Sequence, residues 1–523
     1  MSVNDKLCHK TGRRLSLRPL QRSTCPSPSF IKLALKSLRD VNQGNTDFLH
    51  MLSLKQTICR TFFFPMKFSI TTWQKPSNRG EQLPQSTPSI SDQRTSPNLP
   101  FEIWRRIIAF TIRLAGSTSI DLDDPFSPPY QNEEHPEVDP ALFEDRKALR
   151  LVCSSWRSVV TEISAEYLII YSAKELKALV KQFEAQNRSK TIGKRLGEWT
   201  TRIDCRILGH YSVSHITRLL RCTPNLLIYD IRNGPPDIPE KCTPIEVLKG
   251  LVANCSKLQR LGWSGAGETP RYQDLVLVCN GLPNLVTLRL ASIFSFPVRS
   301  EGVPPMLMFP KLKTLSLAVI PGPDPPDTRP EYAMTWDPFM LYLSVQSRQL
   351  PDLQRLECDI FPMLTMGFFH MHGHKIRSFR TTAWSADGIL AEALPLFSNL
   401  ESFVISQGSE SLIEFPIYHP TIQKICIIPS IEADVEVPPR VFSVAVMTPL
   451  DTVLQSLEKM TAPRLNELRI RNIGSFSSII DYNVWLRFWW RRWNIRGVRF
   501  LDKSGVSYHE VYDRMCFFFF FPP

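Results

Sequence analysis

Apolar residues recur in a short pattern along residues 200–470, in which an aliphatic lead residue is followed by apolar residues three and five positions later. Most intervals between copies lie in or near the range of about 20–29 residues that is typical of leucine-rich repeats. Each copy predicts a short strand with alternating faces, and stacked copies predict one continuous core. An ordinary α/β domain whose strands begin with leucine is the alternative. The lead residues are Leu226, Leu258, Leu285, Leu312, Leu353, Ile376, Leu400, Ile422 and Leu465.

Two segments with an apolar stripe at helical spacing precede these copies. The first, 99–112, places Ile103 and Ile107 one turn apart on the same side. Helical spacing resumes at 146–163. The stretch 114–145 between them contains five prolines and nine acidic residues but no lysine or arginine. This composition predicts a solvated loop.

The basic charge of the chain is concentrated at its beginning. The net charge is +12, and residues 1–98 hold 15 Lys and Arg against 5 Asp and Glu, which leaves only +2 for the remainder. A nucleic-acid surface requires the charge on the folded domain itself, so this distribution makes nucleic acid an unfavoured partner. Residues 1–98 predict a disordered tail, with a mitochondrial transit peptide as the alternative. The phenylalanine runs at 62–64 and 517–521 suggest translated polypyrimidine tracts of a mis-drawn gene model.

Motifs for catalysis are missing from the sequence. The chain contains no G-x-S-x-G, Walker A, H-E-x-x-H or G-x-G-x-x-G motif, which predicts a protein that is not an enzyme and uses no cofactor. The 12 cysteines include no C-x-x-C pair and are typical of reduced thiols in a cytoplasmic or nuclear protein. Neither a long apolar run nor a secretory signal is visible, so we expect no contact with a membrane.

Together, 99–112 and 146–160 resemble the F-box, with the letters L-P-x-E-I-W-x-x-I-I and then L-x-L-V-C-x-x-W-x-x-V-V. An F-box followed by the repeats is similar to fungal-type F-box proteins with leucine-rich repeats. This resemblance implies an α+β multidomain fold, in which a small all-α F-box precedes a leucine-rich-repeat α/β solenoid. The expected divisions are a tail (1–98), an F-box with an acidic insertion (99–165, insertion 114–145), a solenoid with a C-terminal cap (166–500) and an irregular tail (501–523).

The resemblance implies a role in a Skp–cullin–F-box ubiquitin ligase. The F-box would bury an apolar face against a Skp-type adaptor and through it join a cullin, while the solenoid holds a protein substrate. Packing of the same residues against the first repeats is the alternative. The implied adaptor contacts are Leu99, Pro100, Ile103, Trp104, Ile107, Ile108, Leu151, Val152, Trp156 and Val159.

The substrate surface is expected on the concave face, because solenoids bind along it. Mixed charge there favours a protein or peptide. An interaction scaffold that is not coupled to ubiquitin transfer is the second functional hypothesis, and a nucleic-acid-binding protein is the third. On the assumed register the substrate-binding side chains are Asp230, Arg232, Arg289, Arg355, Glu357, Asp359, Arg380, Lys424, Glu467, Arg469 and Arg471.

Two further clusters of chemically active residues have simpler structural interpretations. His370, His372 and His374 would share one face of a strand and there could hold zinc, but Gly373 indicates a turn, so no metal is predicted. The Trp- and Arg-rich stretch 485–496 could stack nucleic-acid bases. A helix that caps the last repeat, with Trp485, Phe488, Trp489 and Trp493 inside and its arginines in solvent, is the favoured interpretation.

Overall fold

The chain divides between Asn98 and Leu99. The predicted tail 1–98, both phenylalanine runs and residues 509–523 lie outside the described residues. The computed structural model describes residues 100–114, 116–117, 119–122, 124–127, 140–188, 195–232, 241–263, 268–291, 293, 306–317, 336–358, 364–382, 388–407, 413–429, 444–471 and 483–508.

Three helices come first, α3 (Phe101–Ile112), α4 (Pro140–Arg150) and α5 (Ser154–Glu166). Their shared core includes Ile108, Ile112, Leu149 and Val160. The expected single helix over 146–163 is therefore wrong, because a turn at 151–153 separates α4 from α5. The Cys153 thiol accepts a hydrogen bond from the Trp156 amide at 3.5 Å and so caps α5. Helix α4 also begins inside the stretch that was expected to be a loop.

Twelve strands of the described chain form one open parallel sheet, which follows the chain order apart from two short strands that pair separately, β4 (Lys241–Cys242) and β6 (Glu268–Thr269). This arrangement confirms the predicted mixed α/β class. The strands of the large sheet are β1 (Tyr167–Ile170), β2 (Arg202–Cys205), β3 (Ile228–Ile231), β5 (Arg260–Trp263), β7 (Thr287–Leu290), β8 (Thr314–Leu317), β9 (Arg355–Glu357), β10 (Ser378–Thr382), β11 (Ser402–Gln407), β12 (Lys424–Pro429), β13 (Glu467–Ile470) and β14 (Arg499–Leu501).

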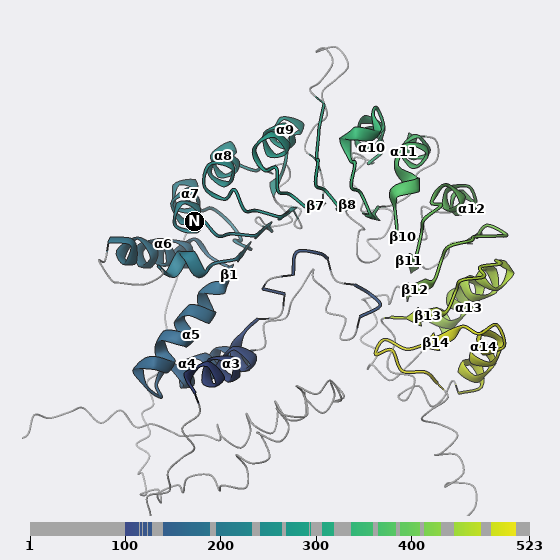
Figure 1. Cartoon of the computed structure of the whole chain (residues 1–523), viewed down its shortest axis with the longest axis horizontal. Helices are drawn as coiled ribbons and strands as arrows, with labels where there is room; N and C mark the ends of the chain where they lie inside the picture. The colour runs from purple at the N-terminus through teal and green to yellow at the C-terminus, as the bar shows by residue number, and fades with distance from the viewer. Residues whose placement is uncertain are drawn as a thin grey trace, which may run out of the picture. The chain divides into compact units, whose positions relative to one another are not determined.

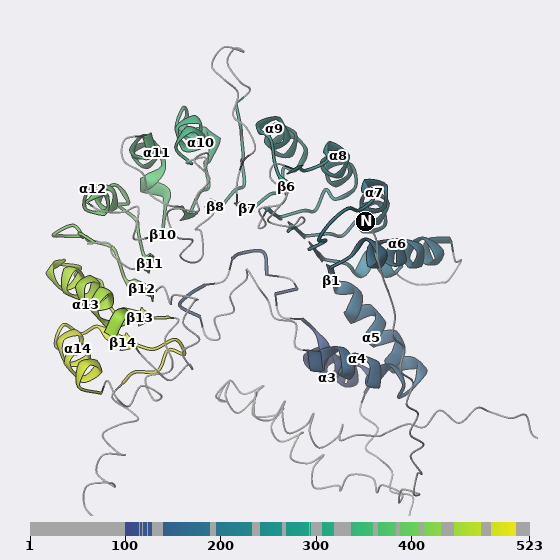
Figure 2. The same ribbon diagram turned by 180° about the vertical axis from the view of Figure 1, so that it is seen from behind.

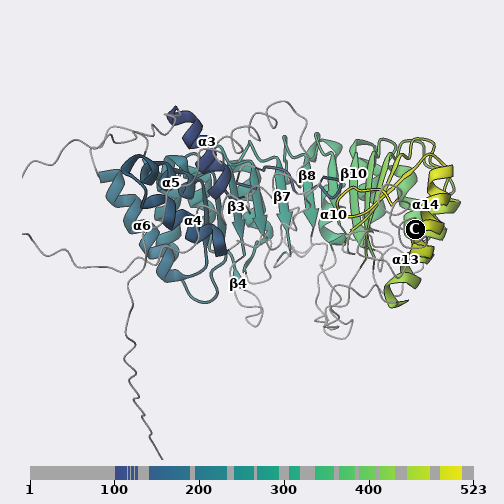
Figure 3. The same cartoon turned by 90° about the horizontal axis from the view of Figure 1, so that it is seen from below.

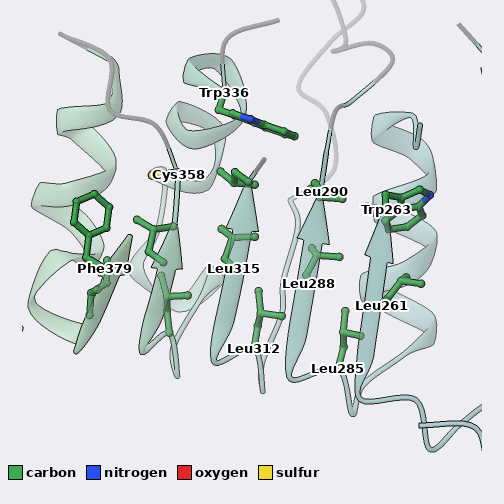
Figure 4. Close-up of a cluster of buried hydrophobic side chains, with 14 of the residues drawn as sticks. Leu261, Trp263, Leu285, Leu288, Leu290, Leu312, Leu315, Trp336, Cys358 and Phe379 are labelled. Atoms are coloured by element: carbon green, nitrogen blue, oxygen red, sulfur yellow. The ribbon is translucent and has the colours of Figure 1, made fainter. Parts of the chain in front are cut away.

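The repeated sequence pattern forms the core of this sheet. Each of its nine copies produces a strand that begins two residues after the lead aliphatic residue, and every lead side chain is at most 8% exposed. Leu288 is in register with Leu261 on one side and Leu315 on the other, so equivalent side chains stack from unit to unit. Figure 4 shows these leucines between the strands and the helices behind them. Stacking buries apolar faces that no single unit could cover.

Helices cover one face of the sheet, which we call the outer face, and the opposite face is the inner face (Figures 1 and 2). Some of these outer helices are replaced or extended by short 3₁₀ helices. The 3₁₀ helices are η1 (Leu196–Trp199), η4 (Ser347–Gln349), η5 (Gly373–Lys375) and η7 (Leu394–Leu396). The outer helices are α6 (Ala173–Arg188), α7 (Val213–Cys222), α8 (Ile245–Asn254), α9 (Tyr272–Gly281), α10 (Asp337–Leu343), α11 (Leu364–His372), α12 (Ile389–Ala393), α13 (Val444–Lys459) and α14 (Asn483–Ile495).

The two ends of the sheet differ from what the sequence predicted. Helix α14 does not close the array, because β14 follows it and adds the last strand. Part of the expected irregular tail is folded as well, since Asp502 and Tyr508 are buried. At the other end α5 continues directly into β1, so no linker separates the helical unit from the sheet (Figure 1). Figure 3 shows α4 and α5 at one end of the row of strands and α14 at the opposite end.

Candidate functional site

The first candidate surface surrounds a pair of tryptophans. Trp104 lies in the first turn of α3 and Trp156 in the first turn of α5, and their ring centroids are 5.1 Å apart with planes inclined by 48°. Both indoles are only half-buried. Their contact joins two segments on either side of the acidic insertion. Three exposed apolar side chains precede the tryptophans in the chain, namely Phe101, one turn before Trp104, and Leu151 and Val152 in the turn before α5.

Exposure separates the expected adaptor contacts into three groups. Pro100, Leu151 and Val152 are exposed, and Ile103, Trp104, Ile107 and Trp156 are half-buried. Ile108 and Val159 are each 1% exposed and belong to the core of the helical unit, so their expected direct contact is wrong. Leu99 lies outside the described residues.

Sequence reasoning missed three exposed aromatic residues of the helical unit. Phe101 is 49% exposed, Phe110 55% and Phe143 46%, whereas Leu151 is 75% and Val152 56% exposed. Phe101 was recognisable, because it precedes Trp104 by three residues and must share its side of the helix. Phe143 was not, since it lay in the expected loop. Large exposed apolar side chains on a unit this small are typical of a surface that binds another protein.

The second candidate surface is the inner face of the sheet, where oppositely charged side chains pair along strands β2, β9 and β13. Arg202 donates to Asp204 at 2.8 Å, Arg355 to Glu357 at 2.6 Å, and Arg469 to Glu467 at 2.6 Å. These pairs lie two residues apart, which places both partners on the same face of a strand.

Glu357 of β9 is a buried carboxylate of this face. Burial opposes its ionisation, but the nearby guanidinium groups of Arg355, Arg380 and Arg289, with a hydrogen bond from Ser316, outweigh burial and lower the pKa of Glu357 to about 2. The carboxylate is therefore ionised at neutral pH and fixes the arginines around it.

The chain itself covers much of this face. We call the described residues between Gly116 and Ser127 the strap. Arg202 Nη1 donates to the Gly116 carbonyl oxygen at 2.8 Å, Arg355 Nη1 to that of Leu122 at 2.9 Å, and Arg471 Nε to that of Pro125 at 2.6 Å. Figure 1 shows the strap running from α3 along the inner side of the strands.

The path of the strap corrects the expected solvated loop, and it also corrects the expected exposure of the substrate-binding residues. The acidic insertion is not a solvated loop throughout, because Ser117, Leu122, Pro125 and Phe126 of the strap are buried. The arginines of the sheet supply donors for its carbonyl groups, which allows its backbone to leave water.

The predicted substrate-binding residues are consequently not a freely exposed surface. Asp359 lies outside the described residues, and Arg232, Arg289, Arg355, Arg380 and Lys424 are half-buried. The buried ones, for which the expected exposure is wrong, are Asp230, Glu357, Glu467, Arg469 and Arg471.

The strap ends in an aromatic anchor. Phe126 is 7% exposed and packs on Val404, Cys426 and Ile428 of β11 and β12. The Lys424 ammonium lies 5.7 Å from the centroid of its ring. Sequence patterning gave no signal for this contact, since almost 280 residues separate Phe126 from its nearest partner in the chain.

The histidine cluster lies on a helix and a 3₁₀ turn instead of a strand. His370 and His374 are exposed, but His372 is buried and its Nε2 is 2.8 Å from the Leu343 carbonyl oxygen. No group of three His, Cys, Asp or Glu side chains suited to a metal ion occurs among the residues that the structure describes.

Helix α14 packs its aromatic side chains mostly as expected. Trp489 and Trp493 are 1% exposed, and Trp485 is half-buried. Phe488 is 48% exposed, so its expected place on the inner stripe is wrong. Arg492 forms an ion pair with Glu458 of α13 at 2.6 Å.

The chain matches no family model and no curated protein with which it was compared. Within the described part of the chain, none of the helices combines the length and apolar character that crossing a membrane requires.

Proposed function

We propose that the chain is the substrate-recognition subunit of a Skp–cullin–F-box ubiquitin ligase. In this proposal α3 to α5 are the F-box, and the strand-and-helix units that follow are leucine-rich repeats. The F-box binds the Skp-type adaptor, the repeats hold a protein substrate, and the chain contributes no catalytic group.

The Trp104–Trp156 contact carries this proposal. It brings together the two halves of the F-box-like sequence, and both indoles remain partly exposed, as do Leu151 and Val152 shortly before Trp156 in the chain. Aromatic side chains surrounded by apolar neighbours are typical centres of protein interfaces. An adaptor that covers this face would remove about five large apolar side chains from water.

The junction between the helical unit and the sheet supports transfer by proximity. Helix α5 runs into β1 without a linker, and the Arg113 side chain at the end of α3 forms an ion pair at 2.8 Å with Glu166, the last residue of α5 before β1. The Arg105 guanidinium also lies 5.2 Å from the Trp199 ring centroid of η1. A substrate held on the sheet would thus stay at a fixed distance from the adaptor, which raises its effective concentration at the ligase.

Capture of the purified Skp-type adaptor from the same species tests this proposal. The double variant Leu151→Ser and Val152→Ser removes two exposed apolar side chains, so folding should be preserved while adaptor capture falls at least about tenfold. The matched control is Ile417→Ser with Val484→Ser, because both of these residues are more than 80% exposed but belong to other parts of the chain. Equal capture by the wild type, the variant and the control would contradict the proposal.

Coupling to ubiquitin transfer is a separate question from adaptor binding. Under the proposal, a cullin co-purifies with the wild-type chain through the adaptor and is lost with the Leu151→Ser, Val152→Ser variant. Adaptor capture without cullin would instead support a scaffold that is not coupled to ubiquitin transfer.

A further inference from the structure

The inner face of the sheet contacts the strap chiefly through carbonyl groups. Besides the bonds of Arg202, Arg355 and Arg471 described above, Arg260 Nη1 donates to the Asp121 carbonyl oxygen at 3.3 Å. Arg471 Nη2 also reaches the Ser127 carbonyl oxygen at 3.1 Å. Every peptide has such carbonyl groups, so these arginines bind the backbone of the strap independently of its side chains, including at the turn in which the Ser127 amide donates to the Asp124 carbonyl oxygen at 3.0 Å.

Two side chains of the strap add sequence preference. The Phe126 ring occupies the apolar site formed by Val404, Cys426 and Ile428, with Lys424 over its face. The Asp121 carboxylate accepts a hydrogen bond from Thr314 Oγ1 at 3.4 Å. An acidic residue and an aromatic residue five positions later are therefore the features of the strap that the sheet distinguishes.

The charges of the face favour a peptide over a nucleic acid. Its arginines are held by carboxylates of the same face, as in the pairs Arg202–Asp204 and Arg469–Glu467, which are buried. Those carboxylates would repel a phosphate backbone, whereas guanidinium groups held in this way still donate to neutral carbonyl oxygens.

We infer that this face is a binding site for a segment of another protein that carries an acidic residue followed, five positions later, by an aromatic residue in a turn like that of the strap. The strap is the occupant that the chain itself supplies, and the external segment binds when the strap leaves. The inference depends on the proposed function in one respect, namely that the segment bound here would belong to the substrate. Because the strap is tethered, its local concentration is high. The strap therefore occupies the binding site most of the time until a competing segment binds.

A peptide with the strap's own sequence, residues 116–127, is the direct probe. Labelled with a fluorophore, it should bind the Phe126→Ala chain at least about tenfold more tightly than the wild type, since loss of the anchor weakens the tethered competitor. A peptide in which the phenylalanine is replaced by alanine should bind the same chain at least about tenfold more weakly.

Two arginines of the same face supply a matched pair of controls. In the Phe126→Ala background, Arg471→Ala removes the donors to the Pro125 and Ser127 carbonyl groups of the strap, together with one to Lys503, and should abolish peptide binding. Arg499→Ala in the same background removes a side chain that pairs with Glu467 at 3.0 Å and should leave peptide binding unchanged.

Three outcomes would overturn the inference. The peptide fails to bind the folded Phe126→Ala chain, or it binds equally well without its phenylalanine, or circular dichroism shows that Phe126→Ala unfolds the repeats. The last outcome would make the strap a structural tie that cannot leave. Adaptor capture uses the Trp104–Trp156 face, so it should remain at the wild-type level in all these variants, and failure of this inference is distinguishable from failure of the proposed function.

Discussion

Two buried histidines join successive units of the repeat array. His372 Nε2 faces the Leu343 carbonyl oxygen at 2.8 Å, and His419 Nε2 faces that of Leu394 at 3.1 Å. The Nδ1 atom of His372 is 3.3 Å from Lys375 Nζ, which donates to it. Each ring therefore suits the neutral tautomer with its proton on Nε2.

The lowered pKa values of these histidines predict that the free energy of unfolding falls in mild acid. Burial lowers the pKa of His372 from 6.5 to about 4 and also lowers the pKa of His419. Above pH 6.5 both folded and unfolded chains are neutral at these sites, so stability is unaffected there. Between pH 6.5 and about 4 the unfolded chain binds protons that the folded chain does not, which costs up to about 3 kcal/mol at His372.

Urea unfolding at pH 7 and pH 5 measures this effect. The His372→Gln chain should show a smaller fall in unfolding midpoint between the two pH values than the wild type. His370→Gln, which alters an exposed residue of the same helix, should keep the wild-type difference. An identical fall in all three chains would contradict the role given to His372.

The lead aliphatic residues show how far residue patterns predict this fold. A buried leucine, an extended backbone and a turn repeat in every unit, so short-range sequence was sufficient to locate nine strands. The partners of Arg471 were beyond such reasoning, because Pro125 lies 346 positions earlier in the chain. The sequence identified the arginine but not the carbonyl group that it binds.

Besides the Arg492–Glu458 ion pair, Asp451 of α13 joins helices α13 and α14. Asp451 Oδ1 accepts hydrogen bonds from Trp485 Nε1 at 3.1 Å and Trp489 Nε1 at 2.7 Å. Substitution Asp451→Ala leaves both indole groups without this acceptor and should lower the free energy of unfolding by about 2 to 4 kcal/mol.

Asp451→Asn is the matched control, since the amide keeps an acceptor oxygen in the same place. Its loss of unfolding free energy should be less than half of that caused by Asp451→Ala. Denaturant titration followed by tryptophan fluorescence measures both, and equal losses for the two variants would rule out the shared acceptor as the stabilising feature.

The expected loop over 114–145 shows where element prediction failed. Its acidic and proline-rich composition indicated solvation, yet its first part lies on the sheet and its last residues begin α4. Composition describes the average environment of a segment, whereas the arginines of β2, β5 and β9 determined where this backbone lies. Half of the candidate docking face could nevertheless be predicted from the sequence, because Trp104 and Trp156 lie on helices that the apolar spacing indicates.

In the whole molecule, the two proposed partners bind separate surfaces. One is the apolar face around the Trp104–Trp156 pair, and the other is the inner face of the sheet that the strap occupies. The strap begins four residues after the end of α3, and its last residue, Ser127, is bound by Arg471, which directly follows β13, so it connects the docking unit with the far end of the array.

Hydroxyl-radical footprinting with mass spectrometry tests whether the adaptor binds at the apolar face around Trp104 and Trp156. On addition of saturating Skp-type adaptor, oxidation of Trp104, Trp156 and Leu151 should fall at least about threefold, because an interface core excludes water. Trp485 on α14 should react at an unchanged rate. Unchanged oxidation of Trp104 and Trp156 in the presence of bound adaptor would contradict the docking face proposed for this chain.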